Sequence, residues 1–202
     1  NYAARVRATR PPPPDVLFAW STAIGTFALD GVVLLFVLLI ARGLPFRDAF
    51  ALRPPASWSN AARIAALALI ATWGTSLVLE LTVGHAAREQ GVPQFWDPDR
   101  LPAFAANAVA IALFAPFVEE MLCRGVGFTL LEGWGERAAI GGTAVAFALA
   151  HGAVLDLPWV LVTGLGLGYL RARSGSLYPC LALHATVNGI AVIASALVAR
   201  AA

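Results

Sequence analysis

Long apolar stretches separated by short polar ones restrict the folds open to this chain. The longest stretch runs from Leu101 to Leu131, the first from Val16 to Ile40 and the last from Leu177 to Val198. A helix of about 20 apolar residues crosses the hydrocarbon core of a bilayer. Each of these three stretches is long enough to do so. The chain is therefore predicted to be a helical membrane protein.

Further apolar segments cover Ile64 to Val83, Ala138 to Leu155 and Pro158 to Leu170, and the last two are short for a membrane span. We predict an all-α fold, a polytopic transmembrane bundle of about six to eight helices, some of them short or broken. Residues 1–15, with three arginines and a run of four prolines, are expected to form a polar N-terminal arm. Residues 16–202 are expected to form a single transmembrane domain without internal repeats.

Charged residues are few, and their distribution bears on partners and orientation. Only 13% of the chain is charged, against about 25% for a typical soluble domain. The arginines are scattered over loops and form no basic patch, so no nucleic-acid partner is expected. The loop after the first apolar segment and a tight basic turn at 171–175 are predicted to be cytoplasmic. All 14 basic residues are arginine, and the arginine-, alanine- and proline-rich composition favours a bacterial inner membrane.

The longest apolar stretch contains two adjacent glutamates and an arginine. Ionisable side chains are costly at membrane depth, so such a cluster is a candidate functional site. Glu120 and Arg124 lie at i and i+4 with the acid first, the favourable order for an ion pair. Glu119 points about 100° away from Glu120 and has no partner nearby in sequence, so it could serve as a general base. Pro116 is expected to kink the helix beside these carboxylates.

Two other polar groups interrupt later apolar segments. His151 ends one of them, and alone it would be read as an interfacial histidine. His184 and Asn188 lie at i and i+4, so they share a helix face, where they could also serve as a contact between helices. The third histidine, His85, lies in a loop and is expected to be solvated. Together with Glu119, two imidazoles and an amide are the groups needed to hydrolyse an acyl bond.

The three groups match one family in order and spacing. Glu-Glu-x-x-x-Arg at 119–124, Phe-x-x-x-His at 147–151 and His-x-x-x-Asn at 184–188 resemble the CAAX prenyl protease and bacteriocin-processing family of intramembrane proteases. The sequence Gly-Ser-Leu-Tyr-Pro at 175–179 is similar to that family as well. The resemblance covers a motif-bearing core at residues 101–195. It implies an intramembrane endopeptidase that hydrolyses a peptide bond of a membrane-associated protein or peptide.

The resemblance also implies catalytic roles. Glu119 would activate water with help from His151, and His184 and Asn188 would stabilise the oxyanion. The family has been described both as glutamate-type and as metal-dependent. The glutamate-type reading needs no cofactor, and it is favoured because Asn188 is a good amide donor but a poor zinc ligand. The alternative is one divalent metal, zinc by ligand type, held by Glu119, His151 and His184.

The remaining polar residues in apolar segments are given supporting roles. By the same resemblance, Glu120 and Arg124 would brace the site. Cys123 stands where the family leads us to expect a bulky aromatic side chain, and it could widen a pocket. Both Cys123 and Cys180 are expected to be free and buried, and a thiol in apolar surroundings has too little thiolate for covalent catalysis. Asp30 is expected to face the bundle interior in a hydrogen-bonded role, with a second functional acid as the alternative.

Two other functions would fit the same residues. A non-catalytic membrane scaffold or chaperone of the same fold would keep them as polar contacts between helices. A transporter or proton relay would line a path with the same glutamate and histidines, but the sequence has no inverted repeat to support it.

Gly164, Gly166 and Gly168 are expected to allow close helix packing. Bacteria generally lack prenylated proteins, so a prenylated substrate is not expected if the origin is bacterial.

Overall fold

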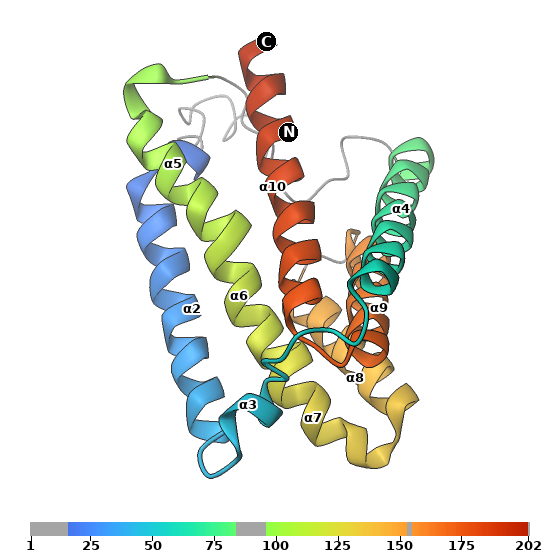
Figure 1. Ribbon diagram of the computed structural model, residues 1–202. Coiled ribbons are helices and arrows are strands. Elements are labelled where there is room, and N and C mark those ends of the chain that lie inside the picture. Colours follow the sequence, from blue (N-terminus) through green and yellow to red (C-terminus); the bar gives the residue numbers. More distant parts are fainter. Residues whose placement is uncertain (1–15, 84–95, 153–154, 202) are drawn as a thin grey trace, which may run out of the picture.

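The computed structural model describes residues 16–83, 96–152 and 155–201, and over these residues the chain is helical without strands. Its helices form a bundle in which the segment that follows residue 98 runs through the middle, between α2 and α10 (Figure 1). The predicted polar arm at 1–15 and the predicted solvated His85 lie outside the described residues. The all-α fold is confirmed.

The elements follow the apolar segments of the sequence. The first half of the chain contains η1 (Val16–Phe18), α2 (Trp20–Ile40), α3 (Phe46–Ala49) and α4 (Trp58–Val83). The central helix contains η3 (Pro98–Arg100), α5 (Leu101–Val109), η4 (Ala110–Phe114), α6 (Ala115–Glu120), η5 (Met121–Gly127), α7 (Phe128–Leu131) and η6 (Glu132–Trp134). The last part contains α8 (Glu136–Ala150), α9 (Leu157–Ser174) and α10 (Tyr178–Ala201).

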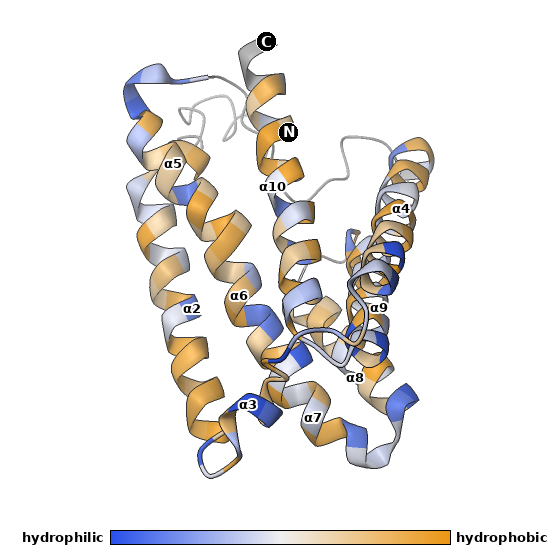
Figure 2. Ribbon diagram, viewed as in Figure 1, coloured by the Kyte–Doolittle hydropathy of each residue, from blue (hydrophilic) through white to orange (hydrophobic). Residues whose placement is uncertain are grey.

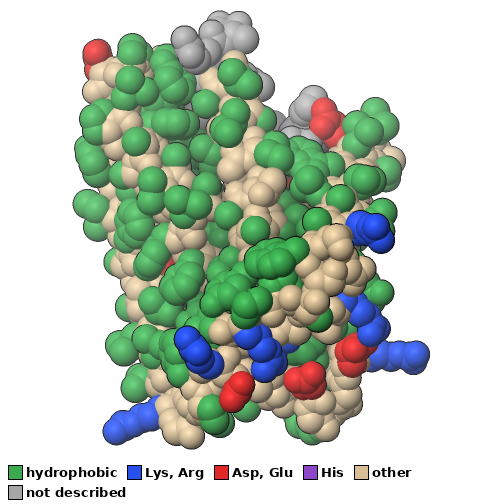
Figure 3. All heavy atoms as spheres, in the orientation of Figure 1, with side chains coloured by type: hydrophobic (Ala, Val, Ile, Leu, Met, Phe, Trp, Pro, Cys, Tyr) green, Lys and Arg blue, Asp and Glu red, His purple; other side chains and the backbone are tan. Residues whose placement is uncertain are grey.

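Four helices of the described chain are long and apolar enough to cross a membrane. They are Trp20–Ile40, Trp58–Thr82, Pro98–Trp134 and Tyr178–Leu197. Their apolar residues cover the outside of the bundle, where a soluble protein would carry charge (Figures 2 and 3). Leu81, for example, is 77% exposed. This outer surface is suited to lipid, so the predicted polytopic transmembrane bundle is confirmed and the protein is integral to a membrane.

Helix α9 lies between α4 and α8, and its glycines explain how it fits there. A Cβ atom at Gly164 would lie 3.1 Å from the Cα of Ala144 on α8. A Cβ atom at Gly166 would lie 2.7 Å from the Cβ of Ala68 on α4. Gly168 faces α8 again, with Ile140 at 3.3 Å. The predicted role of these three glycines in close helix packing is confirmed.

The central helix is irregular on both sides of α6. The segments η4 and η5 are π-helical, a distortion that is frequent at functional sites. The first ends just before Pro116, where the sequence predicted a kink. The sharper break is at Gly125, which has non-helical dihedral angles of φ −80° and ψ −109°. A Cβ atom there would lie 2.5 Å from the ring of the buried Phe50, so a close approach of the α3 end requires glycine at this point.

Candidate active site

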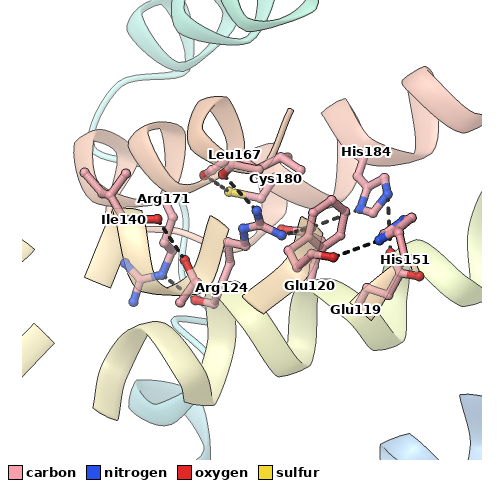
Figure 4. Close-up of polar contacts among 12 residues, drawn as sticks. Glu119, Glu120, Arg124, Ile140, His151, Leu167, Arg171, Cys180 and His184 are labelled. Carbon is pink, nitrogen blue, oxygen red and sulfur yellow. Dashed lines mark hydrogen bonds and ion pairs between the residues drawn. The ribbon is translucent and has the colours of Figure 1, made fainter. Parts of the chain in front are cut away.

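Glu120 lies at the centre of the polar cluster. Its side chain and that of Arg124 are fully buried. Arg124 Nη1 donates to Glu120 Oε1 at 2.9 Å, so the ion pair expected from the i, i+4 spacing is present. His184 Nδ1 donates to the same oxygen at 2.9 Å from α10 (Figure 4). One oxygen of Glu120 therefore joins two distant parts of the chain.

Arg124 extends this cluster to α8 and α9. Its Nη2 donates to the carbonyl oxygen of Gly164 at 2.8 Å. Its guanidinium carbon lies 4.6 Å from the centre of the Phe147 ring, a cation–π contact. The same ring lies edge-on to His184, with 5.5 Å between ring centres. Phe147 thus packs against both the cation and the imidazole that hold Glu120.

Glu119 is in a different environment from its neighbour. Its Oε2 lies 3.6 Å from His184 Nε2, and its side chain is 31% exposed. This oxygen is itself buried and has no hydrogen-bond partner within the described part of the chain. The two ring nitrogens of His184 therefore face two successive carboxylates, one that is fully buried and paired with Arg124 and one that is partly exposed.

A pocket of ≈330 Å³ opens beside Glu119, between the α6–α7 stretch and α8. Glu119 and His151 both line it, so the structure brings these two predicted residues to one cavity. The other lining residues are mostly small or apolar: Leu122, Cys123, Gly127, Leu131, Gly142, Thr143, Ala146, Phe147 and Ala150. An apolar pocket with a few convergent polar groups is the usual form of a ligand site.

His151 ends α8, and its ring orientation is fixed by the helix backbone. Its Nδ1 lies 2.9 Å from the carbonyl oxygen of Phe147, which can only accept a hydrogen bond. Nδ1 therefore carries the proton, and Nε2 is the nitrogen left for other contacts. The two rings are also in contact, with 4.6 Å between their centres.

Asn188 and His184 do not line the pocket that Glu119 and His151 share. Asn188 Nδ2 donates to the carbonyl oxygen of Ile111 at 2.9 Å, within the π-helical η4. One of its two N–H groups is thus used to join α10 to the central helix. The oxyanion roles of Asn188 and His184 stay predictions.

The metal alternative needs three ligands close together. Among the residues that the structure describes, no three His, Cys, Asp or Glu side chains are grouped so that they could hold one metal ion. This includes the set Glu119, His151 and His184 named from the sequence. As placed, these three side chains do not form a zinc site.

The two cysteines and Asp30 lie in or near the apolar interior of the bundle. Cys123 is 8% exposed on the pocket wall and Cys180 is fully buried, and both are free, as expected. Asp30 on α2 is half-buried. Its Oδ2 is buried but has no hydrogen-bond partner among the described residues, which does not fit the hydrogen-bonded role expected for it.

Sequence reasoning missed one polar residue of this cluster and misplaced its segment. The basic stretch from Arg171 to Gly175 was predicted to be a turn, but α9 continues through Ser174. Arg171 is only 4% exposed, and its Nε donates to the carbonyl oxygen of Arg124 at 2.9 Å. The prediction was wrong because charge alone was read as exposure. A signal was present, since Arg171 lies seven residues after Gly164 and so on the same face of α9.

Comparison with known proteins agrees with the motif pattern. Residues 101–190 match the family model described as type II CAAX prenyl endopeptidase Rce1-like. The match covers 90 of the 202 residues, so this segment is similar to that family. The matched segment contains the whole polar cluster and the pocket, so its similarity to CAAX endopeptidases includes the candidate site. No curated protein and no solved structure gives a significant match.

Proposed function

We propose that the protein is an endopeptidase that hydrolyses a peptide bond of a membrane-associated protein or peptide, with water activated by Glu119. The observation that supports this most is the contrast between two adjacent carboxylates. Glu120 is buried and bonded to Arg124 and His184. Glu119 lines the pocket and its side chain is 31% exposed, whereas the side chain of Glu120 is fully buried. A general base must lie within reach of water, and of these two carboxylates it is Glu119 that borders the pocket.

The reaction can be written with this chain's own residues. Glu119 takes a proton from water, and the hydroxide oxygen adds to the carbonyl carbon of the substrate peptide bond. His151 helps to hold the water through its Nε2. The protonated Glu119 then gives its proton to the leaving nitrogen, the carbon–nitrogen bond breaks, and a carboxyl group and an amine are released.

The oxyanion of the tetrahedral intermediate would be stabilised by donors from α10. His184 donates from Nδ1 to Glu120, and its Nε2 faces the Glu119 side at 3.6 Å. In its doubly protonated form, His184 would present an N–H group to an oxyanion beside Glu119. Asn188 has a second amide N–H besides the one bonded to Ile111. Such donors act most strongly where water is excluded.

The test is a comparison of protein termini in cells that express the wild type or Glu119→Gln. New termini produced by the wild type should disappear in the variant, which keeps the shape of the side chain but cannot accept the proton. Glu132→Gln is the matched control, because Glu132 is an exposed carboxylate near the end of the same long helix. Cleavage at the wild-type rate by Glu119→Gln would show that the base is assigned wrongly.

The cofactor and the cellular setting belong to the same proposal. The proposed reaction needs no metal, so dialysis against a chelator should leave cleavage unchanged, and loss of cleavage that zinc restores would favour the metal alternative.

The composition supports a bacterial inner membrane, where the substrate would carry no prenyl group. A scaffold of the same fold would tolerate Glu119→Gln in a phenotypic assay, whereas the protease would not.

A further inference from the structure

Two arginines near the end of α9 have opposite environments. Arg171 is 4% exposed and lies with its guanidinium carbon 4.9 Å from the centre of the Phe128 ring. Arg173, two residues later, is exposed and pairs with Glu136 at 2.7 Å. A buried arginine is costly unless it meets specific partners. Arg173 has the surface role that is usual for arginine, and Arg171 does not.

The partner of Arg171 is a main-chain carbonyl at the break in the central helix. In an α-helix the Phe128 N–H would donate to the carbonyl oxygen of Arg124. Because η5 is π-helical and Gly125 is non-helical, that N–H is directed instead to the carbonyl oxygens of Cys123 and Gly125. Arg171 Nε supplies a donor to the Arg124 carbonyl at 2.9 Å. The bond is charge-assisted and buried, which makes it one of the stronger kinds.

Helix α9 thus bonds both the side chain and the main chain of Arg124. The carbonyl of Gly164 accepts from the Arg124 guanidinium at 2.8 Å, and Arg171 donates to the Arg124 main chain. Gly164 and Arg171 are two helical turns apart on one face of α9. Arg124 in turn bonds Glu120, and Glu120 bonds the His184 nitrogen opposite the one that faces Glu119. The chain of contacts from Arg171 to Glu119 is continuous (Figure 4).

We propose that Arg171 is a positioning residue that fixes the kinked η5 segment and thereby aligns the two glutamates with His184. It contacts none of the proposed reacting atoms, and its effect on the reaction passes through Arg124. The catalytic part of this inference rests on the proposed function. The conformational part does not, because it concerns the backbone around Arg124 whatever the reaction is.

The experiment compares Arg171→Met with Arg173→Met in the full-length protein in detergent. Methionine fills apolar space without a donor, so Arg171→Met leaves the Arg124 carbonyl without this bond. Cys123, which precedes Arg124 and is 8% exposed, reports local opening of η5. We expect N-ethylmaleimide to modify Cys123 at least about tenfold faster in Arg171→Met, as read by mass spectrometry, because local opening governs access to a buried group. Arg173→Met should react like the wild type.

The second readout is cleavage at the termini that depend on Glu119. Arg171→Met should lower the rate at least about tenfold, since misplacement of catalytic groups is costly. The melting temperature should stay near that of the wild type, because methionine removes the desolvation cost of a buried guanidinium and its partner here is a neutral carbonyl. Arg171→Lys keeps a donor and is expected to recover part of both readouts. It also serves as the test variant if Arg171→Met does not fold.

The outcomes separate this inference from the proposed function. Unchanged Cys123 modification and unchanged cleavage in Arg171→Met would overturn the positioning role. A fall in cleavage that only follows a fall in melting temperature, with Cys123 still protected, would overturn it as well. If Glu119→Gln still cleaves but Arg171→Met exposes Cys123, the proposed base is wrong and the conformational role of Arg171 stands.

Discussion

Two neighbouring glutamates, Glu119 and Glu120, have the same side chain but different surroundings. One oxygen of Glu120 accepts hydrogen bonds from a guanidinium and an imidazole in a fully buried site. Glu119 lines the pocket, and its Oε2 lies 3.6 Å from His184 Nε2. A rotation of about 100° between successive helix residues is enough to create this difference. These environments favour a structural role for Glu120 and the proposed catalytic role for Glu119.

Removal of Arg124 should show how much Glu120 depends on it. Arg124→Ala leaves a buried carboxylate without its main partner, so the free energy of unfolding should fall by about 3–5 kcal/mol. Arg173→Ala breaks an exposed ion pair and should cost at most about 1 kcal/mol. Thermal and denaturant unfolding in detergent would measure both. The bracing role would be refuted if Arg124→Ala melts at the wild-type temperature.

The double variant Arg124→Ala with Glu120→Gln adds a check on the same pair. With no charge left to strand, its loss of stability should be smaller than the sum of the two single losses, since residues in direct contact do not act additively. Simple additivity would mean that the ion pair contributes nothing specific.

Contacts between residues close in the sequence could be predicted, and contacts between distant residues could not. The Glu120–Arg124 pair is local, and the i, i+4 rule was sufficient to find it. The contact between Glu120 and His184 joins residues 64 positions apart and could only follow from the fold. The Arg124–Phe147 contact was not predicted either, since helix periodicity carries no information on which faces of separate helices meet.

The central helix is irregular where it contributes residues to the polar cluster. The π-helical η5 and the break at Gly125 turn the backbone where the polar cluster meets α9. The sequence indicated a distortion through Pro116, which does lie next to the π-helical η4. It did not indicate the sharper break, because the need for glycine at 125 comes from Phe50, a residue 75 positions away that no local pattern connects to it.

Gly125→Ala should therefore be destabilising. Its Cβ would lie 2.5 Å from Phe50 Cδ1 in a buried contact, and overpacking of this kind typically costs about 1–3 kcal/mol. Gly141→Ala is the matched control, because that glycine lies within α8 with open space beside it, and alanine there should be neutral or stabilising by up to about 1 kcal/mol. Unfolding curves for the two variants would decide, and equal tolerance of both would contradict the steric argument.

In the whole molecule, three of the described polar connections meet at one end of the bundle. Arg53 Nε on the α2–α4 connection donates to the carbonyl of Gly175 at the α9–α10 turn. Arg173 pairs with Glu136 at the start of α8. These bonds bring three connections together, and the charged side chains collect along the lower edge of the space-filling view (Figure 3). The apolar segments predicted the bundle itself, but only the fold shows that these loops share one face.

This arginine-rich end is expected to face the cytoplasm, because basic loops next to membrane spans are retained on that side. Arg47, on the connection after α2, and Asp99, before α5 at the other end, offer two exposed positions for a test. Cysteine placed by Arg47→Cys should react with a membrane-impermeant maleimide only after spheroplasts are lysed, and cysteine placed by Asp99→Cys should react in intact ones. The native Cys123 and Cys180 are buried, so the background should be low. Labelling of the Arg47→Cys variant in intact spheroplasts, with the Asp99→Cys variant protected, would reverse the orientation and place the arginine-rich end outside.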